Sequence, residues 1–123
     1  MKMIHTENAP AAIGPYSQAM VSGGFVFTSG QIPVDPATGN LVTGDIAAQA
    51  EQVMQNLRAV LDAAGSGLEK AVKATCYLAS MDDFAAFNAV YGKYMTNKPA
   101  RSCVAVKTLP KNVLCEVEVI AEV

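Results

Sequence analysis

The sequence predicts an α+β protein in which a sheet of about six strands carries two helices on one face. Two observations support this fold class. Apolar residues recur at helical spacing over residues 46–64 and again over residues 84–95. Strand-like segments rich in Val, Phe and Cys lie before, between and after these two stretches. Because both helices must bury an apolar stripe, we expect them on one face of a mixed or largely antiparallel sheet. A length of 123 residues is typical of a single domain, here 1–123.

The amino-terminal half shows the clearest local signals. Residues 19–21 and 25–28 flank Ser22-Gly23-Gly24, which predicts a β-hairpin. The helix predicted over residues 46–64 follows Asp45, whose carboxylate suits an N-cap, and Gly65-Ser66-Gly67 should end it.

The carboxy-terminal half repeats this pattern. Residues 72–79 predict a strand, and Ser80 is placed to cap the second helix. Residues 102–107 and 114–123 predict the two final strands.

Composition and charge exclude several classes of protein. Hydrophobic residues make up 51% and charged residues only 16% of the chain, which favours an apolar surface covered by a partner, most simply a homo-oligomer. A net charge of −2 without any basic run argues against nucleic-acid binding. No signal peptide or membrane-length apolar run is present, so we expect no membrane association and a cytoplasmic location.

The cysteine and histidine content predicts no metal site. Cys76, Cys103 and Cys115 have no ligand spacing, and His5 is the only histidine. Cys76 and Cys115 are expected to be small buried residues. No residue pattern calls for a cofactor.

Alternation along the last two strands suggests a site. Cys115, Val117, Val119 and Ala121 form one apolar set that should face the helices, which leaves Glu116 on the other face. If Val104 and Val106 also face the helices, Arg101 and Cys103 share the face of Glu116. The alternative is an ordinary solvated ion pair between Arg101 and Glu116. An arginine fixed at a strand start suits bidentate binding of a carboxylate, which makes the segment 99–103 a candidate carboxylate site.

Other candidate residues each have a structural alternative. Tyr16 follows Gly14-Pro15 in a rigid turn, and its ring could equally be packed. Ser29-Gly30 ends a strand where a ligand could approach the backbone, although a simple change from strand to loop explains it as well. Asn88 lies on the apolar side of its helix and must be hydrogen-bonded there. Cys103 lacks an identifiable base, so we interpret it as lining a site rather than as a covalent nucleophile.

Taken together in order, these segments resemble the RidA/YjgF/UK114 family of reactive-intermediate deaminases. The resemblance spans essentially the whole chain. It is carried by Gly14-Pro15-Tyr16-Ser17-Gln18-Ala19, Thr28-Ser29-Gly30-Gln31-Ile32-Pro33, Gln55-Asn56-Leu57, Phe87-Asn88-Ala89-Val90-Tyr91, Pro99-Ala100-Arg101-Ser102-Cys103-Val104, Leu109-Pro110 and Glu116-Val117-Glu118.

The resemblance implies a chorismate-mutase-like fold and a homotrimer with sites in the clefts between subunits. It also implies hydrolysis of 2-enamines and 2-imines, such as 2-aminoacrylate, 2-iminopropanoate and 2-iminobutanoate, to 2-keto acids and ammonia without a metal.

The family's site residues map onto this sequence as follows. Arg101 would clamp the substrate carboxylate, while the backbone at Cys103 and the side chain of Glu116 would position and activate water. Tyr16 would close the site, Ser29 and Gly30 would line it, and Asn88 would support its wall. The alternative function is a non-catalytic trimer that binds keto acids or has a chaperone-like or regulatory role. A ribonuclease fits less well, because the chain has one histidine and no basic stripe.

Overall fold

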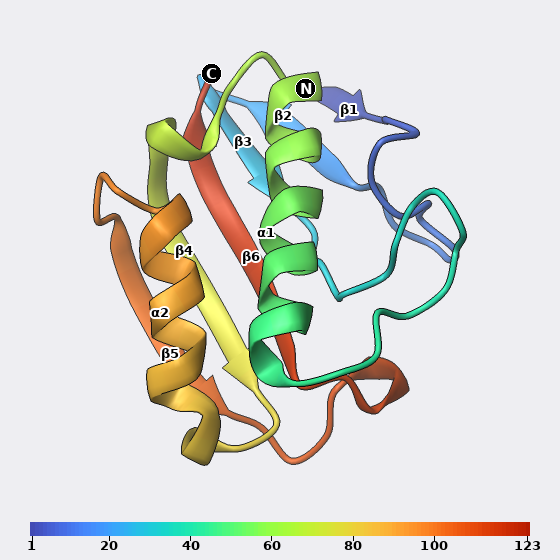
Figure 1. The fold of residues 1–123 in the computed structure, drawn as a ribbon. Coiled ribbons are helices and arrows are strands. Elements are labelled where there is room, and N and C mark those ends of the chain that lie inside the picture. The colour runs from blue at the N-terminus through green and yellow to red at the C-terminus, as the bar shows by residue number, and fades with distance from the viewer.

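The computed structural model describes all 123 residues and contains one six-stranded sheet with two helices on one of its faces (Figure 1). The strand order is β1-β2-β3-β6-β4-β5, and every neighbouring pair is antiparallel except β4 and β5, which are parallel. The predicted fold class is thus confirmed. The strands are β1 (Lys2–Ile4), β2 (Ala19–Ser22), β3 (Phe25–Thr28), β4 (Ala71–Leu78), β5 (Ala100–Ala105) and β6 (Cys115–Glu122).

Both helices begin where the sequence predicts. Helix α1 spans Ile46–Ala63, and the Asp45 carboxylate accepts a hydrogen bond from the Ala48 amide at 3.0 Å. Helix α2 spans Phe84–Tyr94 and follows a 3-10 turn over Met81–Asp83, which Ser80 caps. Two further 3-10 turns cover Leu68–Lys70 and Pro110–Asn112.

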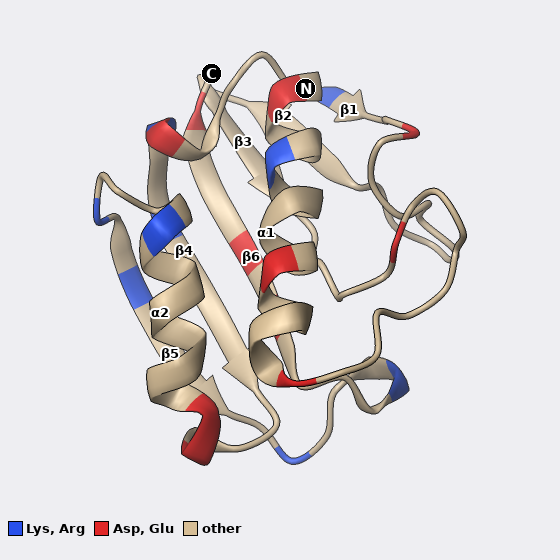
Figure 2. Ribbon diagram, viewed as in Figure 1, with Lys and Arg blue, Asp and Glu red and all other residues tan.

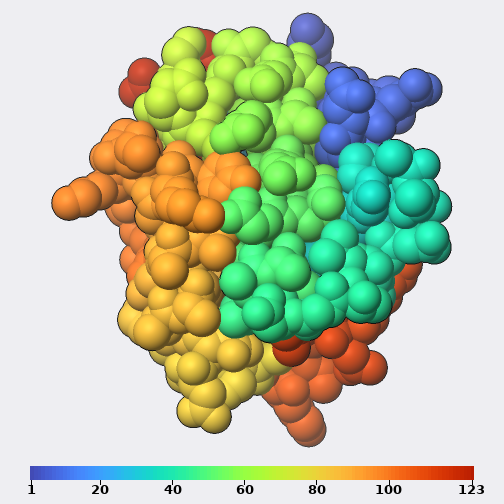
Figure 3. Space-filling model, in the orientation of Figure 1, coloured from blue at the N-terminus to red at the C-terminus, as the bar shows by residue number.

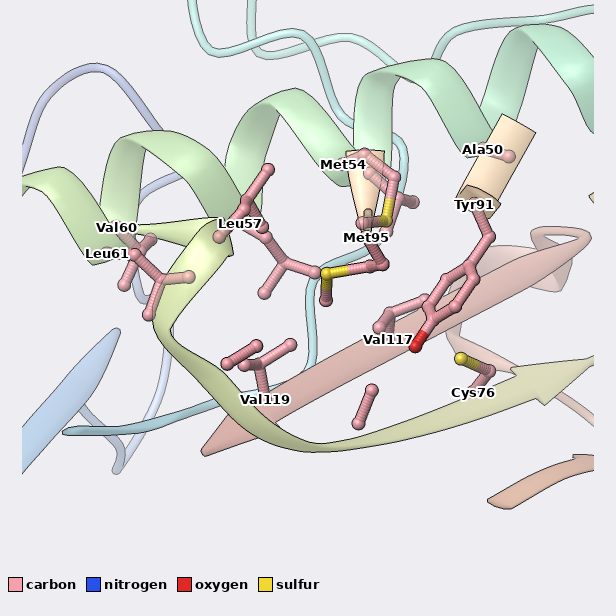
Figure 4. Packing of buried hydrophobic residues seen from close by; sticks show 14 of the residues in the cluster. Ala50, Met54, Leu57, Val60, Leu61, Cys76, Tyr91, Met95, Val117 and Val119 are labelled. Carbon is pink, nitrogen blue, oxygen red and sulfur yellow. The ribbon is translucent and has the colours of Figure 1, made fainter. Parts of the chain in front are cut away.

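The core lies between the helices and the sheet. Met54, Leu57 and Leu61 of α1 are fully buried in one apolar cluster with Val117 and Val119 of β6 (Figure 4). Figure 3 shows the two helices and the loop before α1 closing over this side of the sheet. The alternation predicted for β6 is confirmed, because Cys115, Val117, Val119 and Ala121 are all buried.

The opposite face of the sheet is uncovered and partly apolar. Phe25, Phe27 and Val104 are exposed there. Charged residues are scattered over the chain without a basic stripe (Figure 2). None of the helices has the length and hydropathy needed to cross a membrane.

The predicted orientation of β5 is wrong. Arg101 pairs with Ala74 and Cys103 with Cys76, and both β4 partners are fully buried on the helix side. Val104, expected toward the helices, is 45% exposed on the other face. Alternation separates the two sets of side chains but does not say which set faces the core. In β5 the valines are predicted to face the helices, but the set of side chains that includes Arg101 does so instead. This set is favoured because aromatic rings and an amide on α2 accommodate the guanidinium.

Candidate functional site

Arg101 is held between β5 and α2. Its Nη1 donates to the Asn88 Oδ1 at 2.7 Å, and its guanidinium lies over the rings of Tyr91 and Phe84, with Cζ 4.8 and 5.6 Å from their centroids. We call Arg101, Asn88, Phe84, Tyr91 and Cys103 the Arg101 cluster. The bond to Asn88 is the only hydrogen bond of the guanidinium within the chain, so further N–H donors remain for a ligand.

The backbone beside Arg101 is also available. Strand β5 is at the edge of the sheet, with β4 as its only neighbour. The Val106 amide donates to the Leu78 carbonyl of β4 at 3.0 Å. Because successive residues of a parallel strand direct their polar groups to alternate sides, the amides of Arg101, Cys103 and Ala105 point toward the free edge. The Cys103 N–H can therefore bind a ligand next to the guanidinium.

The Cys103 thiol is poorly suited to act as a nucleophile. It is half-buried, and burial raises its pKa above the ordinary value, although the nearby Arg101 charge works in the opposite direction. The thiolate, which is the reactive form, is thus a minor species at neutral pH. This agrees with the interpretation of Cys103 as a residue that lines a site.

A cavity of about 530 Å³ lies beside β6. Loop residues supply most of its walls, and Glu116 and Lys111 are its only charged residues. We call it the Glu116 cavity. It is lined by Pro10, Ala11, Ile13, Tyr16, Gln18, Gly30, Gln31, Ile32, Val34, Pro36, Gly39, Pro110, Lys111 and Glu116.

Glu116 packs directly against the backbone of Gly30. Gln31 forms a two-way backbone bridge to Val117, which brings the loop after β3 alongside β6. A Cβ atom on Gly30 would lie only 2.8 Å from the Glu116 Cδ and Oε2 atoms. Only glycine allows the carboxylate to keep this position. Burial raises the pKa of Glu116 above its usual value, and the neighbouring Glu118 charge raises it further.

Tyr16 and Ser29 reach the same region in different ways. The Tyr16 ring is half-exposed at the cavity and lies against Gly14. The Gly14 φ of +150° is one that glycine adopts readily and residues with side chains rarely do. The Ser29 hydroxyl donates to the Ser17 carbonyl at 2.5 Å and so ties down the turn that carries Tyr16. Ser29 is therefore a support of the cavity, not a residue that lines it.

Sequence reasoning missed the buried amides that hold the cavity loops. The Asn56 side chain, 1% exposed on α1, donates to the carbonyls of Ile32 and Val34 at 3.1 and 2.9 Å. Gln18 donates to the carbonyls of Thr6 and Pro10 at 3.0 and 2.8 Å. An asparagine inside the apolar stripe of α1 was the available signal, because a buried amide must find partners.

One chain does not bring the two groups of site residues together. Arg101, Asn88 and Cys103 lie on the helix side of β5, whereas Glu116, Gly30 and Tyr16 lie at the cavity beside β6. Strand β4 separates β5 from β6, which puts their backbones about 10 Å apart. The predicted Arg101–Glu116 pair on a single face is therefore wrong for an isolated chain. No three His, Cys, Asp or Glu side chains gather closely enough to hold a metal ion.

Comparisons with known proteins agree with this architecture. The family model described as Endoribonuclease L-PSP matches residues 6–123. The 2-iminobutanoate/2-iminopropanoate deaminase of Salmonella typhimurium is 51% identical over 124 residues, covering 98% of this chain and 96% of that protein.

Two solved structures from E. coli are similar over nearly the whole chain. The YjgF gene product has a TM-score of 0.94 and 48% identity, covering 99% of this chain and 98% of that one. TdcF with bound serine has a TM-score of 0.95 and 42% identity, covering 100% and 99% of the two chains. The sequence match and the shared fold together show that this chain belongs to the RidA/YjgF family, whose sequence model is described as Endoribonuclease L-PSP.

Proposed function

We propose that this protein is a 2-imino acid deaminase that hydrolyses 2-iminopropanoate, its enamine tautomer 2-aminoacrylate, and 2-iminobutanoate to 2-keto acids and ammonia. The observation that carries the proposal is the Arg101 cluster, in which an oriented guanidinium with free donors lies beside a free backbone amide. A planar fork of N–H donors matches the two oxygens of a carboxylate. The 51% identity to a named deaminase supports the same activity.

Glu116 would act as the general base and acid. It removes a proton from a water molecule whose oxygen attacks C2 of the protonated imine, giving a carbinolamine. Glu116 then returns that proton to the amino nitrogen. The C–N bond breaks with its electron pair on nitrogen, and Glu116 takes up the hydroxyl proton as the keto group forms. Transfer of that proton to the released ammonia gives ammonium as the second product and restores the Glu116 carboxylate. The raised pKa of Glu116 suits a group that must both accept and donate a proton.

Both groups can serve one substrate only if two subunits contribute. Arg101 and Glu116 lie on opposite sides of the sheet in one chain, so we propose a homotrimer with each site in a cleft between neighbouring subunits. The uncovered sheet face supports an interface, because Phe25, Phe27 and Val104 expose apolar surface there.

Activity is tested by generating 2-aminoacrylate from serine with a dehydratase and measuring the rate of keto acid formation. Addition of the protein should accelerate keto acid release, and Arg101→Ala should abolish the acceleration. Arg101→Lys keeps the positive charge but lacks the planar fork of donors, so it should retain only part of the wild-type acceleration. Tight binding of 2-ketobutanoate with no acceleration at any pH would instead favour the non-catalytic, keto-acid-binding alternative.

A mixing experiment tests whether a site is shared. Arg101→Ala and Glu116→Gln should each be inactive alone. When the two are unfolded together and refolded, each site between subunits has a chance of roughly one quarter of receiving intact residues from both sides. Recovery of activity near that fraction is expected. No recovery, with normal trimers by light scattering, would contradict a shared site.

A further inference from the structure

Helix α2 presents three side chains to one guanidinium. Phe84, Asn88 and Tyr91 are spaced by four and three residues, which places them on one face of the helix. All three contact Arg101, two through their rings and one through a hydrogen bond. An arginine side chain loses much rotamer freedom when its position is fixed. The contacts with α2 impose this loss on Arg101 before any ligand binds.

Tyr91 is unusual within this set. Its ring is only 8% exposed and stacks against Phe87, with centroids 5.8 Å apart. Its hydroxyl is buried without any hydrogen-bond partner and points toward Cys76 of β4 (Figure 4). Burial raises the pKa of Tyr91 to about 12, so the hydroxyl stays protonated. The hydroxyl thus makes no hydrogen bond, whereas the ring lies under the guanidinium.

We propose that Phe84, Asn88 and Tyr91 are positioning residues that fix the Arg101 guanidinium for carboxylate binding, and that Tyr91 does so through its ring and not its hydroxyl. This inference rests on the proposed role of Arg101 as the substrate clamp. It assigns α2 a part in binding that is separate from its packing in the core.

Asn88 has a second consequence. As a neutral amide it orients Arg101 by accepting one hydrogen bond and leaves the positive charge for the ligand. An aspartate of the same shape would pair with the guanidinium and compete with the substrate carboxylate. Asn88→Asp should therefore bind ligand more weakly than Asn88→Ala, an order that a purely structural role does not produce.

The test measures 2-ketobutanoate binding by calorimetry for the full-length protein and its variants. Tyr91→Leu should raise Kd about tenfold, and Tyr91→Phe should retain the wild-type affinity because the ring remains. Steady-state kinetics should show a raised KM with a nearly unchanged kcat. Binding of the neutral 2-oxobutanamide should be insensitive to all of these substitutions.

The chain offers a matched control, because it has only two arginines. Arg58 lies over the Tyr94 ring, also on α2, with Cζ 5.0 Å from its centroid. Tyr94→Leu should loosen Arg58 and leave ketobutanoate binding unchanged. The Nε–Hε signals of the two arginines in NMR spectra report each side chain separately. Tyr91→Leu should broaden or shift the Arg101 signal alone, and unchanged Arg58 signals show that the variant is folded.

The outcomes separate this inference from the deaminase proposal. An active wild type whose Tyr91→Leu and Asn88→Asp variants bind ketobutanoate normally would overturn the inference alone. A loss of kcat in Tyr91→Phe would also overturn it, because the hydroxyl would then take part in the reaction. A wild type that binds ketobutanoate but hydrolyses no imine would remove the deaminase activity and leave the positioning test intact. Absence of any carboxylate binding would overturn both.

Discussion

The Arg101 cluster and the Glu116 cavity are built on different principles. Arg101 projects from a regular strand onto a regular helix, and the side chains around it fill space and fix its orientation. Glu116 also lies on a strand, but its surroundings are loops, and it keeps its place because Gly30 has no side chain. Arg101, the proposed binding group, is thus held by contacts, whereas Glu116, the proposed general base, depends on a space at Gly30 that must stay empty. The Arg101 cluster and the Glu116 cavity, the two halves of the proposed site, should therefore respond differently to small changes in sequence.

The largest effect should come from Glu116→Gln. Removing the proposed general base should lower kcat by roughly 10²–10⁴-fold, while the Kd for 2-ketobutanoate changes little because Arg101 is intact. Equal losses in kcat and in ketobutanoate affinity would mean that the two halves are not functionally distinct.

Glu116→Gln should also change the thermal stability of the protein. Because the pKa of Glu116 is raised in the folded protein, folding favours its protonated form. That contribution is complete below the pKa of the unfolded chain and is lost as the pH rises through the folded value. At neutral pH the ionised Glu116 carboxylate therefore lowers the stability of the folded protein, and Glu116→Gln should raise Tm. The gain should shrink in melts recorded in acid.

The next largest effect should come from Gly30→Ala. The added Cβ would displace the Glu116 carboxylate, so kcat should fall by about tenfold or more while the protein still folds, since the end of the glutamate side chain can move. Gly92→Ala is the matched control. It adds the same atom to open space on α2 and should keep full activity with equal or higher Tm. Normal kcat in Gly30→Ala would show that the close approach does not matter.

Lys111→Ala should have a smaller effect. Lys111 and Asn112 both have left-handed backbones, with φ of 54° and 56°, which is costly for residues other than glycine and holds Lys111 at the cavity. Its charge offsets that of Glu116 for an anionic substrate. We expect kcat/KM to fall a few-fold at low ionic strength and the difference to shrink with added salt. Lys107→Ala, an exposed lysine outside the cavity, should show no such dependence on salt.

The smallest effect should be a shift in pH dependence. Glu118 raises the pKa of Glu116 through its negative charge. Glu118→Gln removes that charge and leaves an acceptor for the Tyr77 hydroxyl, which donates to Glu118 at 2.7 Å. The acidic limb of the kcat/KM profile should therefore move to lower pH. Tyr77→Phe keeps the charge and should leave the limb at the higher pH.

Local signals predicted most of the fold. Helix α1 was predictable from its apolar spacing and from Asp45, and the first hairpin from Gly23 and Gly24, whose φ values of 61° and 83° favour glycine. Strand β1 was not predicted, because three residues at the start of the chain give no periodicity. The face of Arg101 was missed for another reason, since only tertiary packing decides which side of an edge strand is covered.

The candidate site was predictable in its residue types and not in its arrangement. The sequence pointed to Arg101, Glu116, Tyr16 and Asn88 as candidates. The contact between Glu116 and Gly30 joins residues 86 positions apart and depends on the bridge from Gln31 to Val117, which no local pattern encodes. The support that Asn56 gives to the loop after β3 is equally non-local.

The position of β5 at the edge of the sheet has a consequence for solubility. A free edge offers unpaired amides and carbonyls to other chains and is a common start of aggregation. Here the outward amides belong to Arg101, Cys103 and Ala105, so a ligand held by the guanidinium and the Cys103 N–H would occupy the same groups. Substrate or product would then shield the strand from unwanted pairing, and the protein would be least prone to aggregate when its ligand is abundant.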